Sequence, residues 1–327
     1  MIAVRKPLTM SGVFAPLAYD FLEFKRAQGY KYQGEEKNLQ RFCRFAADYP
    51  LEKAELTKEL VLNWIAVRED EAAKSRVHRI SCVKQFGNYL KLLGYEVFEL
   101  PPQNHLNISS FTPYIFSHDE IIKLFHASDR VQPVAQSREM HKLLPVLIRT
   151  LYSSGLRVSE ALKLQCADVN LHEGILTLRE AKFGKNRLIP ISKSLLNYYR
   201  QYYEEIIYWA NDSDYFFMAP DRTMLSPNTI YQRFRRLLLS GGIPYGGKGY
   251  GPRLHDLRHT FAVHTLQKWV ETGEDLNAML PVLSVYMGHK SFKATSRYLR
   301  LTAEVYPDVI RQVETTCSYV IPGGDVK

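Results

Sequence analysis

Chemically reactive side chains gather in one stretch of the sequence, residues 255–298. This stretch contains His255, Arg258, His289 and Tyr298. Arginine binds phosphate well because its planar guanidinium donates two parallel, charge-assisted hydrogen bonds. A tyrosine phenol has a pKa of about 10, so it attacks phosphorus at neutral pH only where cations and a proton acceptor lie close to it. We therefore expect a site that binds a phosphate group and attacks it.

An arginine upstream of this stretch completes the expected phosphate site. His255 and Arg258 are three residues apart, so they project from the same face of a helix. Arg157 begins another predicted helix and, together with Arg258, would bind both non-bridging oxygens and stabilise a pentacoordinate transition state. The leaving alkoxide needs a general acid. This chemistry requires no metal and no other cofactor, and the sequence offers no cluster of acidic residues to hold a metal.

A zinc site is the first alternative for this helix. His255 and His259 are four residues apart with an acidic residue between them, as in the His-Glu-x-x-His motif of zinc enzymes. Here the acid is Asp256, which is one methylene shorter than glutamate, and Arg258 would place a positive charge beside the metal. No acidic residue downstream is an obvious third ligand. We therefore expect no metal site.

Two further alternatives concern the neighbouring residues. The glycine-rich segment 240–251 lacks the Gly-Lys-Ser/Thr ending of a phosphate-binding P-loop. The histidines could also be ordinary helix residues, and we expect this of His259 and His264. His264 shares a helix face with Leu257 and Phe261, which indicates a position in or against the core.

The charge of the chain favours a polyanionic partner. The formal net charge is +9, and residues 222–311 hold 13 Lys and Arg against 6 Asp and Glu. Residues 1–110 are closer to balance, with 16 against 13. Because the excess lies on the stretch with the reactive residues, we expect nucleic acid as the partner. Charge alone is equally compatible with a basic protein that has no such partner.

Composition indicates a globular protein of the cytoplasm. Of the 327 residues, 46% are hydrophobic and 24% are charged. No apolar run reaches the roughly 18 residues of a membrane-spanning helix, and the first residues lack the apolar core of a signal peptide. The four cysteines are far apart in the sequence, which fits a reducing compartment. We expect a cytoplasmic, nucleoid-associated protein.

Hydrophobic periodicity predicts two mainly α-helical domains. We expect a helical bundle in residues 1–105, a linker in 106–112 and a second domain in 113–327. The predicted helices of the bundle lie at 13–30, 34–48, after Thr57 and at 74–93. Those of the second domain lie at 118–128, 138–153, from Arg157 onward, and at 193–209, 228–239 and 255–270. One antiparallel hairpin, with strands 175–181 and 187–192, is expected between the helix that begins at Arg157 and the helix at 193–209.

Two predicted helices carry basic residues that are candidates for DNA contacts. They are Lys74, Arg76, Arg79 and Lys84 on the fourth helix of the bundle, and Arg233, Arg235 and Arg236 in the second domain. Such contacts to the DNA backbone would position the protein without reading the base sequence. Basic stripes on single helices are also common as solvated faces, and that alternative stays open.

The ordered set of reactive residues resembles a known family. The sequence is similar to the tyrosine recombinases, also called the phage integrase family, in Arg157 within TLYSSGLRVSEALKL, His255 and Arg258 within LHDLRHTFAVHTL, the Gly288-His289 pair, and Tyr298 nine residues later. The resemblance covers residues 13–311. It implies an N-terminal helical core-binding domain, SAM-like in fold, and an α-rich catalytic domain with a small antiparallel sheet.

The resemblance also implies a role for each residue. Tyr298 attacks the scissile phosphate, forms a 3′-phosphotyrosine and releases a 5′-hydroxyl. Arg157 and Arg258 bind the non-bridging oxygens, while His255 and His289 assist proton transfer and hydrogen-bond the phosphate.

A lysine on the predicted hairpin supplies the general acid in this scheme. Lys182 matches the family lysine that protonates the leaving 5′-oxygen, and Lys185 is the alternative. Tyr286 and Tyr306 are rivals for the nucleophile, but neither stands nine residues after His289.

The expected activity is that of a site-specific recombinase or mobile-element integrase. It would act on a double-stranded recombination site, assemble as a tetramer in the synapse through the tail at about 304–327, and could use an accessory DNA-bending or directionality factor. A tail folded back onto its own chain is the alternative for that segment. Two other functions stay open: DNA relaxation of the type IB topoisomerase kind, and a non-catalytic DNA-binding regulator.

Overall fold

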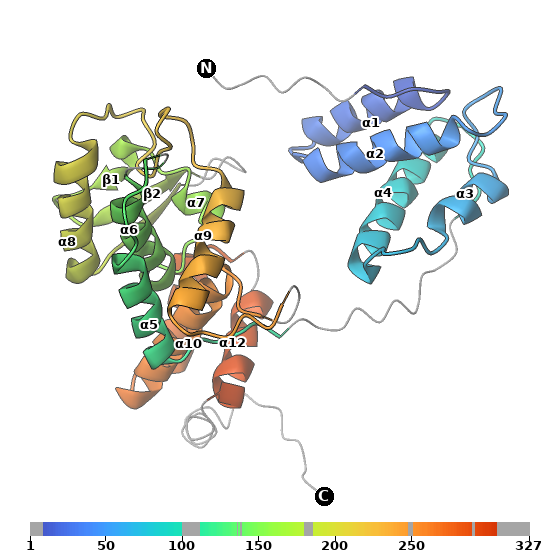
Figure 1. Cartoon of the computed structure of the whole chain (residues 1–327). Helices are drawn as coiled ribbons and strands as arrows, with labels where there is room; N and C mark the ends of the chain where they lie inside the picture. Colours follow the sequence, from blue (N-terminus) through green and yellow to red (C-terminus); the bar gives the residue numbers. More distant parts are fainter. Residues whose placement is uncertain are drawn as a thin grey trace, which may run out of the picture. The chain divides into compact units, whose positions relative to one another are not determined.

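The chain divides into two compact units, residues 1–111 and 112–327 (Figure 1). The computed structural model describes residues 9–99, 112–179 without 136 and 138, 186–247, 251–289 and 292–305, with only the backbone at 292–294 and 303–305. Several predicted features lie outside the described residues: Lys182, Lys185, Tyr306, the linker up to residue 111, and the tail from 306 onward.

The first unit is a bundle of four helices. They are α1 (Ala15–Ala27), α2 (Gln33–Ala46), α3 (Lys58–Ile65) and α4 (Ala73–Leu92). Aromatic rings fill its core: Phe42 lies 5.5 Å from Phe14, 6.3 Å from Phe86 and 5.2 Å from Trp64, measured between ring centroids. All four side chains are fully buried. Large buried rings contribute much of the hydrophobic stabilisation of a small bundle, and the predicted helical bundle is confirmed.

Local capping explains where several helices begin. The side chain of Thr57 accepts a hydrogen bond from the backbone N–H of Leu60 at the start of α3, as expected for an N-cap threonine. At the start of α5 (His118–Asp129), Ser117 and Glu120 form the predicted capping box, in which each side chain accepts from the other's backbone N–H. Both predicted helix starts are confirmed.

The second unit is mainly α-helical with one small sheet. Its further helices are α6 (Met140–Ser153), α7 (Val158–Ala161), α8 (Lys193–Tyr202), α9 (Pro227–Ser240), α10 (Asp256–Glu271), α11 (Leu276–Met287) and α12 (Phe292–Val305), with short helical turns at η1 (Cys166–Asp168) and η2 (Tyr203–Ile207). The strands β1 (Val169–Asn170), β2 (Ile175–Arg179) and β3 (Asn186–Pro190) form an antiparallel sheet in the order β1-β2-β3.

The predicted hairpin is confirmed, although the sheet has one more strand than expected. The sequence pattern missed β1 because its two residues, Val169 and Asn170, are too few to show an alternation. The chain between β2 and β3 carries both candidate general acids and lies outside the described residues.

Helix α6 lies at the centre of the second unit. Residues 143–151 of this helix are all buried, and it packs against α5, α8 and α10. A smaller core lies among α10, α11 and α12 and includes Leu266, Leu283, Met287, Tyr298 and Leu301. These helices therefore hold the C-terminal reactive residues on a packed support. No helix among the described residues is long and apolar enough to cross a membrane.

Candidate active site

Arg157 stands at the N-cap of α7, directly after a tight turn. Gly155 in that turn has φ +58°, and a Cβ atom there would lie 2.4 Å from the ring of Phe261 on α10, so only glycine fits. The guanidinium of Arg157 donates to Glu160 Oε1 at 2.6 Å and to the carbonyl oxygen of Gly288 at 3.4 Å. Its side chain is 39% exposed, which leaves it available to a ligand.

Arg258 is buried at the start of α10 and crosses to two other segments. Its Nη1 donates to the carbonyl oxygen of Gly155 at 2.5 Å, and its Nη2 donates to that of Met287 at 2.6 Å. Burial, followed by the charge of Arg157, lowers the pKa of Arg258 to about 10, so the side chain remains charged at neutral pH. Two fixed carbonyl acceptors hold the guanidinium in one orientation.

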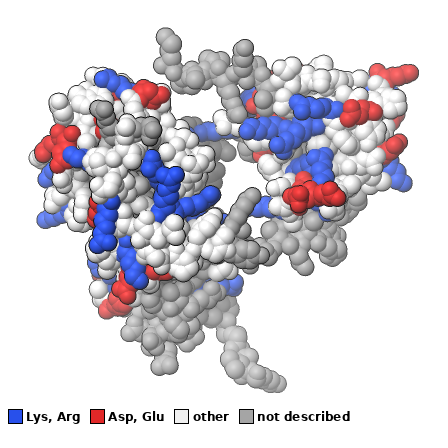
Figure 2. All heavy atoms as spheres, in the orientation of Figure 1, with Lys and Arg blue, Asp and Glu red and all other residues white. Residues whose placement is uncertain are grey.

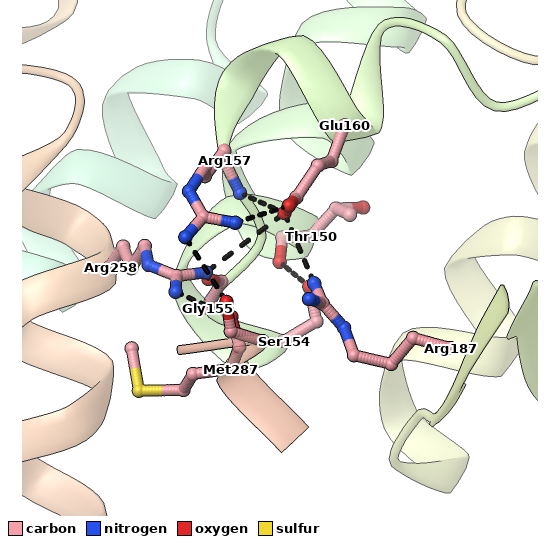
Figure 3. Close-up of polar contacts among 9 residues, drawn as sticks. Thr150, Ser154, Gly155, Arg157, Glu160, Arg187, Arg258 and Met287 are labelled. Carbon is pink, nitrogen blue, oxygen red and sulfur yellow. Dashed lines mark hydrogen bonds and ion pairs between the residues drawn. The ribbon is translucent and has the colours of Figure 1, made fainter. Parts of the chain in front are cut away.

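The carboxylate of Glu160 lies among three arginines (Figure 3). Arg157 bonds it at 2.6 Å, Arg187 of β3 at 3.3 Å, and Arg258 Nη1 lies 4.0 Å from it. Burial raises the pKa of Glu160, but the hydrogen bond and charge of Arg157 and the charge of Arg187 outweigh this effect and lower it overall. The ionised carboxylate therefore offsets part of the repulsion between the arginines.

Sequence reasoning missed both Glu160 and Arg187 as members of the site. The signal for Glu160 was available, because it follows Arg157 by three residues and caps the same helix start. Arg187 gave no such signal, since strand position alone does not show which loop a long side chain reaches.

The turn that carries His289 depends on a second glycine. Gly288 ends α11 with φ +65°, the left-handed conformation that glycine adopts at helix ends. A Cβ atom at Gly288 would lie 1.4 Å from Nη1 of Arg187. A side chain at this position would displace the guanidinium of Arg187, so the glycine leaves room for that arginine beside the end of α11.

His255 and His289 lie beside the two arginines. Desolvation by the surrounding protein, then the charges of Arg258 and Arg157, lower the pKa of each imidazole to about 4. His255 keeps an exposed side, while His289 is partly buried with Nδ1 2.8 Å from Oγ1 of Thr295. Both rings are therefore neutral hydrogen-bonding groups at pH 7 in the free protein.

Tyr298 of α12 is buried in the same region, with 3% of its surface exposed. Burial raises the pKa of its phenol, whereas the charge and hydrogen bonding of Arg258 act in the opposite direction. The ring of His289 stacks against the Tyr298 ring, with centroids 5.8 Å apart and planes 22° apart. The structure thus brings five of the six predicted catalytic residues together, and the sixth, Lys182, lies outside the described residues.

Two histidines of α10 that we expected to be structural make different contacts. His264 is buried as expected, with Nδ1 2.9 Å from the Tyr152 hydroxyl and its ring stacked on His118 at 4.0 Å. His259 instead places Nδ1 3.0 Å from the hydroxyl of Tyr298. The expectation of an ordinary helix residue missed this contact, because the partner comes from α12, 39 positions later.

Among the residues that the structure describes, no three His, Cys, Asp or Glu side chains lie together as a metal-binding group. His255 and His259 are in edge-to-face contact, with ring centroids 4.9 Å apart.

The predicted DNA-contact residues differ in how accessible they are. Figure 2 shows Lys and Arg side chains on the surface of both units. The exposed members of the predicted set are Lys74, Lys84, Arg235 and Arg236. Arg76 and Arg233 are half-buried and bond to the carbonyl oxygen of Ile65 and to Ser137 Oγ respectively.

Arg79 is the exception, and the prediction for it is wrong. Its side chain is buried, donates to Glu71 at 2.5 and 2.8 Å and lies 5.1 Å from the ring centre of Trp64. The helical spacing placed Arg79 on a basic stripe, but α3 and the segment before α4 cover that side of the helix. This arginine connects α4 to the segment before it and does not face solvent.

Comparison with known proteins gives a consistent assignment. The pattern of the phage integrase family matches residues 115–304. A candidate integrase/recombinase of Sinorhizobium fredii is 32% identical over 92% of this chain and 97% of its own length. The tyrosine recombinase XerA of Pyrococcus furiosus is 29% identical over 61% of this chain and 62% of its own length.

Solved structures support the same fold. The lambda integrase tetramer bound to a Holliday junction has a TM-score of 0.62 and 18% identity, and the match covers 88% of this chain and 77% of that chain. The extent of the family match and the similarity to the Sinorhizobium protein are sufficient for the conclusion that this chain belongs to the phage integrase family, the tyrosine recombinases.

Proposed function

We propose that this protein is a site-specific DNA recombinase that cuts and rejoins strands through a 3′-phosphotyrosine on Tyr298. The observation that carries the proposal is the convergence of Arg157, Arg258 and Tyr298 from three separate elements onto one site. Two fixed cations beside a buried phenol suit attack on a phosphodiester, because they stabilise the charge that develops in the transition state.

Binding of the scissile phosphate is the first step. The partly exposed guanidinium of Arg157 and the buried one of Arg258 would bind the two non-bridging oxygens. The neutral rings of His255 and His289 would donate further hydrogen bonds to the same group. A bound phosphate would also stabilise the protonated form of these rings, since its negative charge offsets the two arginine charges.

Transesterification then proceeds without an external energy source. The Tyr298 phenol gives its proton to an acceptor within the site and its oxygen forms a bond to phosphorus as the bond to the 5′-oxygen breaks. The leaving oxygen takes a proton from Lys182, the expected general acid. The phosphotyrosine keeps the phosphodiester bond energy, so a 5′-hydroxyl of a second strand can reverse the step and join to it. The proposed chemistry relies on arginine charge and needs neither a metal nor ATP.

Assembly on DNA is part of the same proposal. The lambda integrase structure named above is a tetramer on a Holliday junction, and we infer a tetrameric synapse for this chain as well, with the residues after 304 as the docking segment. Lys74, Lys84, Arg235 and Arg236 would contact the DNA backbone. We further infer that the protein acts on DNA in the cytoplasm, at the nucleoid.

A capture experiment tests this function. Wild-type protein is incubated in EDTA with short random-sequence duplexes, and covalent adducts are isolated after denaturation. We expect adducts with one preferred DNA sequence, and strand exchange when that sequence is placed on two duplexes. Adducts that form on any sequence, together with relaxation of supercoiled plasmid and no exchange, would instead indicate a topoisomerase.

A further inference from the structure

The nucleophile of the proposed reaction has a hydrogen-bond partner for its hydroxyl. Nδ1 of His259 lies 3.0 Å from Oη of Tyr298. His259 follows Arg258 directly on α10 and stands one turn after His255. The helix that contributes to phosphate binding therefore also places a nitrogen against the reacting oxygen, within the distance required of a general base.

The neighbouring groups are less suited to take the phenolic proton. His255, to which the family resemblance gives a part in proton transfer, lies with its ring 4.9 Å from that of His259, and His259 is the ring in hydrogen-bond contact with the Tyr298 hydroxyl. His289 faces the Tyr298 ring by stacking, and its Nδ1 is 2.8 Å from Thr295 Oγ1. Arg258 reaches the phenol as a cation and has no lone pair to accept a proton. Among the described side chains, His259 is the one for which a hydrogen bond between an imidazole nitrogen and the Tyr298 hydroxyl is present.

The charge state of His259 in the free protein leaves a nitrogen able to accept. Its pKa is lowered to about 3 by burial first, and then by His255, Arg297, Arg258 and Arg253. Among the described side chains, these groups and Tyr298 are the titratable and charged ones that face it from α10, its N-terminal approach and α12. The ring is therefore neutral at pH 7. A bound phosphodiester would offset the cationic contributions and make the nitrogen more basic as attack begins.

We propose that His259 is the proton acceptor for Tyr298, a role that rests on Tyr298 being the nucleophile. As the Oη–phosphorus bond forms, the Oη–H bond breaks and the proton moves to Nδ1, giving an imidazolium. The bond from phosphorus to the 5′-oxygen breaks, and that oxygen takes its proton from a separate acid. In the reverse step a 5′-hydroxyl attacks and gives its proton to the conjugate base of that acid, the tyrosine oxygen leaves, and His259 returns the proton to it.

The test separates activation of the nucleophile from protonation of the leaving group. The substrate is the duplex captured by wild-type protein, synthesised with a 5′-bridging sulfur at the scissile position, so that the leaving thiolate needs no acid. Single-turnover adduct formation is measured from pH 6 to 9 for the wild type and for His259→Gln, which keeps hydrogen-bonding capacity but does not take up a proton. We expect His259→Gln to be slower by about 10²-fold at pH 7.

The pH dependence distinguishes proton transfer from positioning. Without His259 the phenolic proton leaves to solvent, so the rate of His259→Gln should rise about tenfold per pH unit across this range. The wild-type rate should vary much less. A loss of the same factor at every pH would mean that His259 only positions Tyr298, and a rate within about twofold of wild type would mean that it has neither role.

Two further variants keep the result interpretable. His264→Gln is the matched control, since His264 lies on the same helix and pairs with the Tyr152 hydroxyl at 2.9 Å, and it should retain the wild-type rate and pH profile. Tyr298→Phe should form no adduct. If it still did, the nucleophile assignment would be at fault; if it did not and His259→Gln matched the wild type, the proton-acceptor role alone would fail.

A measurement without DNA covers the case in which His259→Gln does not fold. In protein labelled with ¹⁵N-histidine, the His259 Nδ1 signal should report an acceptor nitrogen and should shift in Tyr298→Phe. An unchanged signal would contradict the hydrogen bond on which the proposal depends.

Discussion

Arg258 donates a hydrogen bond of 2.6 Å to the backbone carbonyl of Met287, the last residue of α11. The same guanidinium bonds the carbonyl of Gly155, in the turn before Arg157. One buried side chain therefore connects the turn that presents Arg157, the helix start with His255 and the helix end before His289. The geometry of the whole site therefore depends on the hydrogen bonds of Arg258, in addition to the charge that this arginine supplies.

Replacement of Arg258 by lysine should damage both stability and activity. A lysine ammonium lacks the planar fork and does not reach the carbonyls of Gly155 and Met287 together. We expect a loss of about 1–3 kcal/mol in the free energy of unfolding, because a buried acceptor is left unpaired, and a fall in adduct formation of about 10²-fold or more. Denaturant unfolding and adduct assays check this. Arg130→Lys, an exposed residue just after α5, should change neither; near-normal activity of Arg258→Lys would show that charge alone is sufficient.

Gly288→Ala tests the contact between the end of α11 and β3. The change combines a left-handed backbone with a Cβ 1.4 Å from Arg187 Nη1. Gly273→Ala is a matched control, since Gly273 has φ +73° with nothing within 4 Å of the added atom. Both variants should lose about 1–2 kcal/mol of stability from backbone strain. Only Gly288→Ala should also lose most of its adduct formation, and equal activity of the two variants would contradict the role given to this contact.

The lowered pKa of His264 predicts how the stability of the protein changes with pH. Its pKa is lowered to about 4, mainly by burial, from the ordinary value of 6.5. Because the pKa of this histidine is lower in the folded protein, the unfolded chain binds the proton more readily. The contribution of neutral His264 to the free energy of unfolding is therefore complete above pH 6.5 and is lost as the pH falls towards 4. Between pH 7 and 5 the wild type should lose about 1–2 kcal/mol more than His264→Gln. Unfolding curves at both pH values measure this, and parallel losses would show that His264 does not titrate as stated.

Arg79 and Lys84 of α4 should behave differently although both are basic. Lys84→Ala should weaken binding to a nonspecific duplex and reduce the slope of log affinity against log salt by about 1, as expected for the loss of one phosphate contact. Arg79→Ala should leave that slope unchanged but destabilise the first unit by about 1–3 kcal/mol, because the partly buried Glu71 carboxylate and the carbonyl of Ala66 lose their donor. A smaller salt slope in Arg79→Ala with unchanged stability would reverse the assignment.

Much of the fold could be predicted because it is encoded locally. Apolar residues at helical spacing located α1, α2 and α4, and capping residues such as Thr57 and Ser117 marked helix starts. The strand β1 was missed because it is too short to show a pattern. Arg79 was misplaced because burial depends on what packs over a helix, which the periodicity of that helix alone does not reveal.

The residues of the candidate site could be predicted from the sequence more readily than the contacts between them. Residue types and spacing led us to expect Arg157, Arg258 and Tyr298 in one site, since phosphate chemistry constrains residue types strongly, and the structure brings the three together. The spacing did not show that Glu160 joins the arginines or that His259 meets Tyr298, because these contacts arise from packing between elements far apart in the sequence.

In the proposed mechanism, Tyr298 forms the covalent bond to DNA. The most direct measurement is mass spectrometry of peptides from adducts trapped on the captured DNA site in EDTA. The result expected is a nucleotide attached through a 3′-phosphate to the peptide that contains Tyr298, and no adduct from Tyr298→Phe. A nucleotide on Tyr286, Tyr306 or any other residue, or an adduct that forms only when magnesium is added, would contradict the account.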